Sequence, residues 1–458
     1  MTVPMVDLAD VQGDILRAYG NSYDRTSYVF VRVDDSERGR AWLGGLVDEV
    51  TTAQPWTGAK PQTTLNIALT RTGLAALGVP EAVIGTFSQE FREGMAERAN
   101  LLSDVGDNAP PNWASGLGTG AAHVLVTVNA QTDAGLEDRL GSLRAGLAEI
   151  GSLAIVHEQD TKLLEGAREH FGFADGFAQP ALEGDPVGRV RGGGVPEKAQ
   201  GWRALALGEF ILGYGDEESR DDPGRLPRAP AAPLGRNGTY MVWRKLHQDV
   251  ALFRRTLREA AQRYENGDEE KLAAKVVGRW RNGTPLIHSP NEEVPGFDAH
   301  AVGSNDFRYD KDPDGRSCPL GAHIRRSNPR DALGFEGRLS FRHRMIRRGM
   351  PYGELLPADV VEDDGRQRGL VFVCFVASIS RQFEGVQVQW LNDGNIFHLG
   401  HDRDFMLGDA TGKGKMTVQG DPPFFLAPQC SFVTTRGGEY LFVPGITALA
   451  AIADTATG

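Results

Sequence analysis

Strand-like and helix-like segments alternate along this chain, and a similar alternation occurs in each half. β-branched and aromatic residues predict strands, whereas apolar residues that recur every three or four positions predict amphipathic helices. In the first half the predicted strands are 27–33, 65–70, 122–128 and 153–158, and the predicted helices are 38–49, 81–103 and 136–150. Such an order is typical of an α+β sandwich with helices packed on an antiparallel sheet.

The second half repeats this rhythm. The predicted strands are 240–244, 369–376 and 440–443, and the predicted helices are 249–264, 269–281 and 379–391. A loop-rich stretch at 282–316 follows the predicted helix 269–281. A loop of this length inside a compact domain is usually functional or disordered. We therefore predict two α+β domains, 1–222 and 239–458, joined by a Pro-, Gly- and Ala-rich linker at 223–238.

The chain has 458 residues and a formal net charge of −12. This length allows two or three packed units, and an acidic balance without a basic stripe argues against a nucleic-acid partner. Arginine is nevertheless concentrated in one region, which requires a local anionic partner or a solvated face. These residues are Arg325, Arg326, Arg330, Arg342, Arg344, Arg347 and Arg348.

Cysteine usage and hydropathy exclude several classes of protein. The three cysteines, Cys318, Cys374 and Cys430, are too few and too scattered for a disulfide framework. No C-x-x-C pair occurs, so zinc ribbons, thioredoxin-like sites and covalent haem attachment are excluded at the level of motifs. The N-terminal residues lack a signal-peptide pattern, and no apolar run approaches the roughly 18 residues of a membrane span. We expect a cytoplasmic protein with no membrane partner.

One acid in the first half stands in an apolar and aromatic setting. Asp175 lies between Phe173 and Phe177, where burial would disfavour the charged carboxylate. Such a cost is usually tolerated where a group does proton chemistry. Gly172 and Gly176 would let the backbone turn tightly or approach a flat ligand closely. A plain Gly-Asp turn explains the same residues, so both interpretations stay open at this point.

Among the ten histidines, His323 has the most distinctive neighbourhood. Small residues precede it in Cys318-Pro-Leu-Gly-Ala322, which leaves room for a bulky planar group, and a basic stretch follows it. Arg330 could bind a carboxylate at the edge of that group with the fork geometry of a guanidinium. For the other histidines a structural or surface role is the simpler interpretation.

These segments resemble those of a known family. Gly172-Phe-Ala-Asp-Gly176 resembles the G-x-x-D-G signature of dye-decolorizing peroxidases, and residues 322–330 resemble their proximal-histidine segment. Residues 345–353 resemble the segment that carries their distal arginine. The resemblance runs nearly end to end, and three motifs in the same order make it specific. Length and insertions look most like the longer subgroups of the family.

The resemblance implies two ferredoxin-like α+β domains, with one noncovalent haem b lodged mainly in the second. His323 would be the axial ligand of the haem iron, and Arg330 would contact a haem propionate. Asp175 and Arg347 would lie on the opposite, peroxide-binding face. Arg344 is the alternative distal arginine, because residues three apart can share one side of a helix turn or lie on opposite faces of a strand.

Further residues follow from the same resemblance. Phe173 and Gly176 would lie against the haem beside the catalytic acid. In many relatives an acid hydrogen-bonds the proximal imidazole, and Glu384 is the nearest acid after the central strand. Electrons from bulky reductants would travel through buried or surface aromatic residues, although core packing is the simpler interpretation of each. These aromatic residues are Trp243, Trp280, Tyr352 and Trp390.

The implied activity is the reduction of hydrogen peroxide to water. Organic reductants such as dyes and phenolics, and also Mn(II), would be oxidised in one-electron steps. Asp175 would move the peroxide proton, and Arg347 would stabilise the negative charge that develops. Two alternatives stay open: a haem-handling protein with incidental peroxidase activity, and a non-haem protein of the same fold. The sequence allows a homo-oligomer without indicating one.

Overall fold

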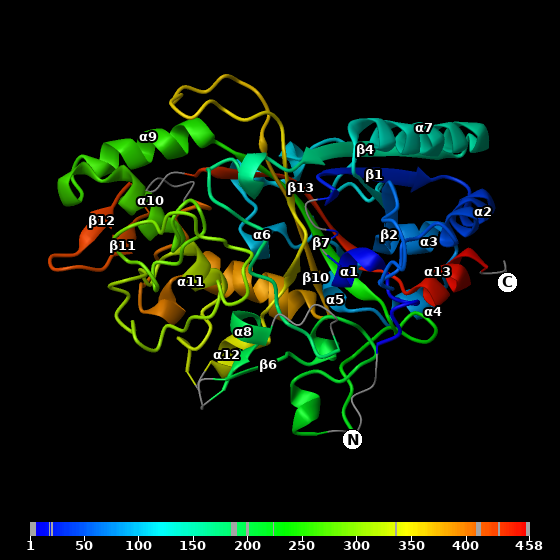
Figure 1. Cartoon of the computed structure of the whole chain (residues 1–458). Coiled ribbons are helices and arrows are strands. Elements are labelled where there is room, and N and C mark those ends of the chain that lie inside the picture. Colours follow the sequence, from blue (N-terminus) through cyan, green and yellow to red (C-terminus); the bar gives the residue numbers. More distant parts are fainter. Residues whose placement is uncertain are drawn as a thin grey trace.

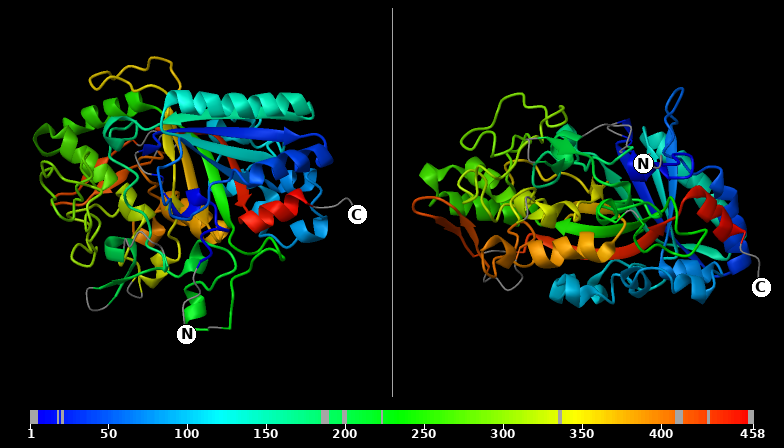
Figure 2. Two further views of the ribbon diagram at one scale, coloured as in Figure 1. Left: turned by 45° about the vertical axis from the view of Figure 1, so that its right-hand side comes forward. Right: turned by 90° about the horizontal axis from the view of Figure 1, so that it is seen from below.

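The computed structural model describes residues 6–17, 19, 22–184, 190–197, 201–222, 224–334, 337–408, 414–428 and 431–454. Within these residues one antiparallel sheet of nine strands crosses the molecule in the order β4-β1-β3-β2-β13-β7-β10-β8, and β9 pairs with β10. Figures 1 and 2 show this sheet through the middle of the molecule, with helices packed around it.

The N-terminal half is a ferredoxin-like unit. Its strands are β1 (Arg25–Val33), β2 (Thr63–Leu69), β3 (Val124–Ala130) and β4 (Leu153–Lys162), and they lie side by side in the order 4-1-3-2. The helix α2 (Ser36–Val47) links β1 to β2, and α7 (Asp133–Ile150) links β3 to β4. The shorter helices are α1 (Gly13–Leu16), α3 (Arg71–Ala76), α4 (Glu81–Ile84), α5 (Gln89–Glu93) and α6 (Ala99–Leu102).

The C-terminal half repeats this strand order. Its four positions are filled by β7 (Thr239–Gln248), the short pair β8 (Ile346–Arg347) and β9 (Met350–Tyr352), β10 (Gly369–Val376) and β13 (Val433–Val443). They again lie in the order 4-1-3-2, because β13 and β10 flank β7 and the short pair lies outside β10. The two predicted ferredoxin-like units are therefore confirmed, and they share one continuous sheet.

Further helices and small strands lie between and after the strands of the two halves. They are α8 (Val190–Gly193), β5 (Val195–Pro196), β6 (Trp202–Arg203), α9 (Val250–Ala261), α10 (Glu269–Val277), α11 (His323–Ser327), α12 (Arg338–Phe341), the π-helical segments η8 (Ile379–Glu384) and η9 (Val386–Leu391), β11 (Met416–Val418), β12 (Phe424–Leu426) and α13 (Ile446–Ala453). The loop predicted at 282–316 is confirmed, since it contains no helix and no strand.

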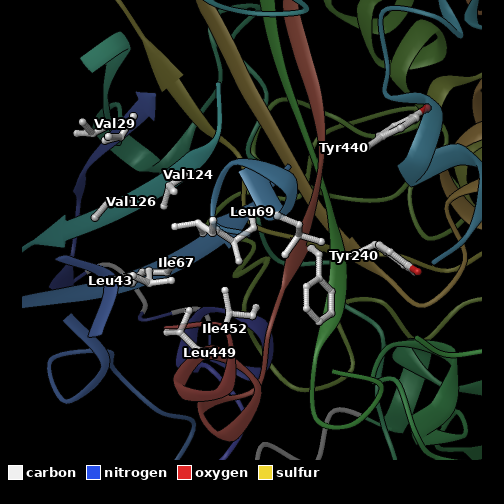
Figure 3. Packing of buried hydrophobic residues seen from close by; sticks show 14 of the residues in the cluster. Val29, Leu43, Ile67, Leu69, Val124, Val126, Tyr240, Tyr440, Leu449 and Ile452 are labelled. Atoms are coloured by element: carbon white, nitrogen blue, oxygen red, sulfur yellow. The ribbon is translucent and has the colours of Figure 1, made fainter. Parts of the chain in front are cut away.

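Both faces of the sheet are buried, which explains why its strands are apolar almost throughout. Along β1, Val29 and Val31 belong to one hydrophobic cluster, whereas Tyr28 and Phe30 belong to another on the opposite face. Side chains of a strand alternate between faces, so one β-branched and aromatic segment supplies two cores. Figure 3 shows the first cluster, in which Leu449 of α13 lies near strand residues of the N-terminal half.

The two halves meet where β13 touches β2. Phe442 of β13 is paired with Leu69 of β2, and β13 also pairs along its length with β7. Because the sheet is continuous, it does not mark where one domain ends and the next begins. The domain boundaries 1–222 and 239–458 therefore stay a prediction. No helix among the described residues is long and apolar enough to cross a membrane.

The helix predicted at 81–103 is broken into α4, α5 and α6. Ser88 caps α5 by accepting a hydrogen bond from the Phe91 backbone, and Gly94 with a φ of 82° follows its last turn. A cap residue begins a new helix and a positive φ ends one, so the chain turns twice. The apolar spacing is nevertheless reflected in burial, because Ile84, Phe91 and Met95 are buried in the core.

The predicted helix at 269–281 also ends early, and the one at 379–391 has a different pitch. α10 stops at Val277 because Gly278 adopts a φ of 97°, a conformation that glycine reaches without strain. The segments η8 and η9 are π-helical and not α-helical. Such π segments are rare and occur mostly near functional sites.

Glu439 of β13 generates a prediction about stability. Its side chain is buried opposite Trp243 and accepts a hydrogen bond from the Gly118 backbone, and burial raises its pKa from an ordinary value of 4.5 to about 7. Between these values the folded chain binds more protons than the unfolded chain, so the free energy of unfolding falls as pH rises.

Glu439→Gln removes this titration while keeping an acceptor for Gly118. We expect the free energy of unfolding of the variant to exceed that of the parent by about 2 kcal/mol at pH 8 and to be similar to it at pH 5. Urea titrations at both pH values measure the difference. An equal effect of the substitution at pH 5 and pH 8 would contradict the explanation.

Candidate active site

All seven residues selected from the sequence line one cavity of about 350 Å³ in the C-terminal half. They are Phe173, Asp175, Gly176, His323, Arg330, Arg344 and Arg347. Strands β7, β10 and β13 provide one wall through Leu246, Phe372 and Val433, whose side chains face the cavity. The structure therefore brings together residues that lie as much as 174 positions apart in the chain (347 − 173).

His323 is the first residue of α11 and is fixed by an acid. Its Nδ1 lies 3.0 Å from Oδ2 of Asp404, whose side chain is fully buried. The carboxylate accepts the Nδ1 proton, which leaves Nε2 as the nitrogen available on the cavity side. Burial lowers the pKa of His323, but the charge and hydrogen bond of Asp404 outweigh it and the net pKa is raised.

The acid that hydrogen-bonds the His323 imidazole is Asp404, and not the acid that the sequence suggested. Glu384 was the predicted partner of the imidazole, and this prediction is wrong. Its carboxylate accepts hydrogen bonds from Arg98, at 2.7 Å from Nη2, and from the Tyr440 hydroxyl at 2.9 Å. Asp404 lies 81 residues after His323 in the chain, in a loop with no helical or strand pattern, so no local sequence signal marks it.

The turn around Asp175 depends on its two glycines. Gly172 and Gly176 have φ values of 97° and 87°, which side chains other than glycine rarely adopt. The two neighbouring aromatic rings have other partners: Phe173 packs in the core and Phe177 lies against the Arg279 guanidinium. Asp175 is consequently exposed on the cavity wall and is not enclosed by aromatic rings.

The two alternative distal arginines occupy different backbone settings. Arg347 is in β8, opposite Cys374 of β10, and its Nη2 donates to the Ala178 carbonyl at 3.1 Å. Arg344 precedes β8, so the two residues share neither a helix turn nor a strand. Burial and the positive charges of Arg330 and Arg347 lower the pKa of Arg344 to about 9.

Arg330 and Arg279 add two more guanidinium groups to this cavity. Arg330 stacks on the Phe307 ring at 3.8 Å, and its Nη1 donates to the carbonyls of Asn305 and Phe307. Arg279 was missed from the sequence; burial and the charge of Arg330 lower its pKa to about 9. Like charges held this close favour an anionic ligand, because such a ligand would relieve their repulsion.

The remaining walls are mainly apolar. They include Val277, Phe307, Leu370, Leu391 and Met406. A flat hydrophobic ligand with carboxylates at one edge matches this combination of apolar walls and arginines. The Nε2 atom of His323 would face the metal of such a ligand, and Asp404 would fix the tautomer that can bind it. The residues present therefore fit a haem.

The four aromatic residues proposed as electron carriers are all buried. Trp243 has 0% exposure, Trp390 2%, Tyr352 4% and Trp280 6%. Trp390 lies behind the cavity wall, with its ring 4.7 Å from that of His343, a residue of that wall. Their burial agrees with core packing, the simpler interpretation of the sequence.

Both halves of this chain are similar to known protein domains. A model described as "DyP dimeric alpha+beta barrel domain" matches residues 10–159, and one described as "Dyp-type peroxidase, C-terminal" matches residues 230–399. Dye-decolorizing peroxidase msp1 of Mycetinis scorodonius is 28% identical over 472 residues, which cover 97% of this chain and 87% of that protein. Multifunctional dye peroxidase DyP2 of an Amycolatopsis species is 29% identical over 477 residues, covering 96% and 95%.

Solved structures agree with these relatives. A dye-decolorizing peroxidase in complex with 2,6-dimethoxyphenol superimposes with a TM-score of 0.77 at 26% identity, covering 98% of this chain and 100% of that one. The fold and the site together define a haem peroxidase. The two family models span most of the chain, and the chain belongs to the dye-decolorizing peroxidase family.

The contact between His323 and Asp404 generates a prediction about haem affinity. Asp404→Asn removes the charge that orients and polarises the imidazole, and we expect haem to bind about 10- to 100-fold more weakly. Transfer of haem to apomyoglobin measures the affinity. Glu384→Gln is the matched control and should keep the affinity of the parent, since Glu384 contacts Arg98 and Tyr440 instead. A larger loss in Glu384→Gln would contradict the assignment.

Proposed function

We propose that this chain binds one noncovalent haem b through His323 and reduces hydrogen peroxide to water. Aromatic reductants, including phenolics and dyes, would each give up one electron per step. The proposal is carried by one observation: the cavity that receives the Asp404-bound imidazole also receives Asp175 and Arg347. The relative solved with 2,6-dimethoxyphenol supports a phenolic reductant.

Each residue has a distinct task in this mechanism. Bound haem supplies an iron centre that passes electrons between peroxide and reductant. Asp175 accepts a proton from one peroxide oxygen and returns it to the other, so that water leaves. The Arg347 guanidinium stabilises the negative charge that develops as the O–O bond breaks, by about 3 kcal/mol. Overall, one peroxide, two electrons and two protons yield two waters.

The exposure of Asp175 on the cavity wall suits this task. A general base must reach the proton that it abstracts, and Asp175 faces open space and not the aromatic core. Arg347 reaches the same cavity from β8, while its hydrogen bond to Ala178 keeps it beside the turn that carries the acid. Arg330, Arg344 and Arg279 would balance the negative charge of haem carboxylates.

Three finer parts of the proposal rest on the sequence. Oxidation of Mn(II) is supported by the net charge of −12, and Mn(III) formation in malonate buffer tests it. A homo-oligomer would be detected by analytical ultracentrifugation. A cytoplasmic location is supported by the three scattered cysteines, an odd number that suits a reducing compartment, and fractionation of expressing cells tests it.

The role of Asp175 separates a peroxidase from a haem-handling protein. Asp175→Asn keeps the size of the side chain but removes the base, so we expect kcat/KM for peroxide to fall about 100-fold or more. Haem affinity should stay at the parent value, because His323 and Asp404 are untouched. Stopped-flow absorbance after mixing with peroxide measures the rate. Unchanged rates in Asp175→Asn would favour the haem-handling alternative.

The choice between the two arginines is tested by a matched pair of substitutions. Arg347→Leu should lower kcat/KM for peroxide about 100-fold, the usual loss when one charge-stabilising donor is removed. Arg344→Leu removes a similar charge from the same cavity and should cost less. Steady-state kinetics over a range of peroxide concentrations measures both. A larger loss at Arg344 than at Arg347 would transfer the role to Arg344.

A further inference from the structure

The turn that carries Asp175 is attached to the backbone of β8 by the side chain of Gln179. The Gln179 amide forms two hydrogen bonds with the backbone of Arg347: Oε1 accepts from the Arg347 N–H at 3.0 Å, and Nε2 donates to the Arg347 carbonyl at 3.0 Å. Gln179 has 7% exposure, so water does not compete freely for these bonds. Gln179 lies four residues after Asp175 and faces the same cavity.

The position of β8 explains why an amide fits here. β8 is the edge strand of the sheet, and the ladder continues on its inner side through the Arg348 N–H, which donates to Val373 of β10. Edge strands present unpaired N–H and C=O groups. A primary amide offers one donor and one acceptor in a fixed plane, so Gln179 pairs with Arg347 as a neighbouring strand would.

The other end of the turn is held by a buried carboxylate. Glu169 accepts hydrogen bonds from the Phe171 N–H at 2.9 Å and from the Phe173 N–H at 3.0 Å. Gln248 of β7 donates to the same carboxylate at 2.7 Å. Burial raises the pKa of Glu169, but its three donors satisfy the oxygens, and they attach the start of the turn to β7.

Between these anchors the turn has further hydrogen bonds, from Gln179 Nε2 to the Gly176 carbonyl at 3.4 Å and from Arg347 Nη2 to the Ala178 carbonyl at 3.1 Å. The Asp175 backbone N–H donates to the Ala167 carbonyl at 3.1 Å, and the Ala174 N–H donates to the Arg281 carbonyl at 2.9 Å. Gly172 and Gly176 on either side allow many backbone conformations. The position of the Asp175 carboxylate relative to Arg347 thus depends on where the ends of the turn are held.

We propose that Gln179 is a positioning residue that sets the separation between Asp175 and Arg347, with Glu169 holding the opposite end of the turn. This inference rests on the proposed function, since it assigns both groups to peroxide cleavage. Gln179 connects the segment of the acid to the backbone of Arg347, and the Arg347 guanidinium bonds Ala178 in return, so the positions of the two groups are coupled. Misplacement of a reacting group by about 1 Å can cost about 100-fold in rate.

The first experiment uses the haem-loaded protein and two substitutions at one position. Gln179→Met keeps the length of the side chain and removes both hydrogen bonds. Gln179→Glu keeps the acceptor for the Arg347 N–H but places a carboxylate oxygen against the Arg347 carbonyl. We expect kcat/KM for peroxide to fall about 10- to 100-fold in both, while KM for 2,6-dimethoxyphenol and haem content stay within twofold of the parent.

A matched control comes from the other half of the sheet. Gln159 lies on β4 and is partly exposed, and among the bonds described its side chain donates only to the neighbouring Asp160 carbonyl. Gln159→Met should keep the parent kcat/KM. The same comparison at the other anchor uses Glu169→Gln, which keeps one acceptor oxygen, and Glu169→Leu, which keeps none. The loss should be larger for Leu than for Gln.

The second experiment needs no turnover. Hydrogen exchange of the haem-free and haem-loaded chain, followed by mass spectrometry, should show faster exchange in peptides covering 172–180 and 345–349 of Gln179→Met, by at least tenfold. Cyanide affinity of the haem-loaded variant gives an equilibrium measure of the same site, because bound cyanide leaves a proton for the distal base. We expect it to fall about tenfold or more.

The outcomes distinguish the two hypotheses. Parent-like peroxide kinetics and exchange in folded Gln179→Met would overturn the positioning role and leave the proposed function intact. If the haem-loaded parent does not turn over peroxide, the proposed function is overturned. Hydrogen exchange would still decide whether Gln179 holds the turn. If Gln179→Met does not fold, the peroxide kinetics of Gln179→Glu test the positioning role instead. The hydrogen-exchange rate of the Arg347 N–H in the parent is the second test, and rapid exchange would contradict the proposal.

Discussion

The last strand of the chain joins the two halves into one molecule. β13 pairs with β7 over its length and touches β2 through Phe442 and Leu69. Without this contact β2 and β13 would be additional edge strands, with unpaired N–H and C=O groups. The same strand contributes Val433 and Thr435 to the cavity wall. A single pairing interaction therefore supports both the overall fold and the geometry of the site.

Electrostatics at the cavity oppose the net charge of the chain. The chain carries −12 overall, yet Arg279, Arg330, Arg344 and Arg347 all line the cavity. Holding them together in a low-dielectric setting costs stability, as the lowered pKa values of Arg279 and Arg344 show. Such a cost is usual where a site is built for a charged ligand. Haem carboxylates would supply the missing negative charge.

Sequence patterns were sufficient for the elements and for the residues within short motifs. The family resemblance implied the ferredoxin-like units and a common site for Asp175, His323 and Arg347, and the structure has the strand order 4-1-3-2 in both halves and places the three residues on one cavity. Asp404 could not be predicted in this way, because its partner is 81 residues away and only tertiary packing joins them. The prediction of one helix at 81–103 was wrong for a local reason, because Ser88 caps a new helix within the segment despite its apolar periodicity.

The anchors of the Asp175 turn show why polar side chains, and not a longer sheet, complete this site. A strand cannot carry the positive φ values of Gly172 and Gly176 without ending, so the turn that exposes the acid must leave the sheet. Its backbone groups still need partners. Glu169 accepts from the Phe171 and Phe173 N–H groups, and Gln179 Nε2 donates to the Gly176 carbonyl at 3.4 Å, at the entropic cost of fixing two flexible side chains. The result is an acid that is open to the cavity but held at both ends of its turn.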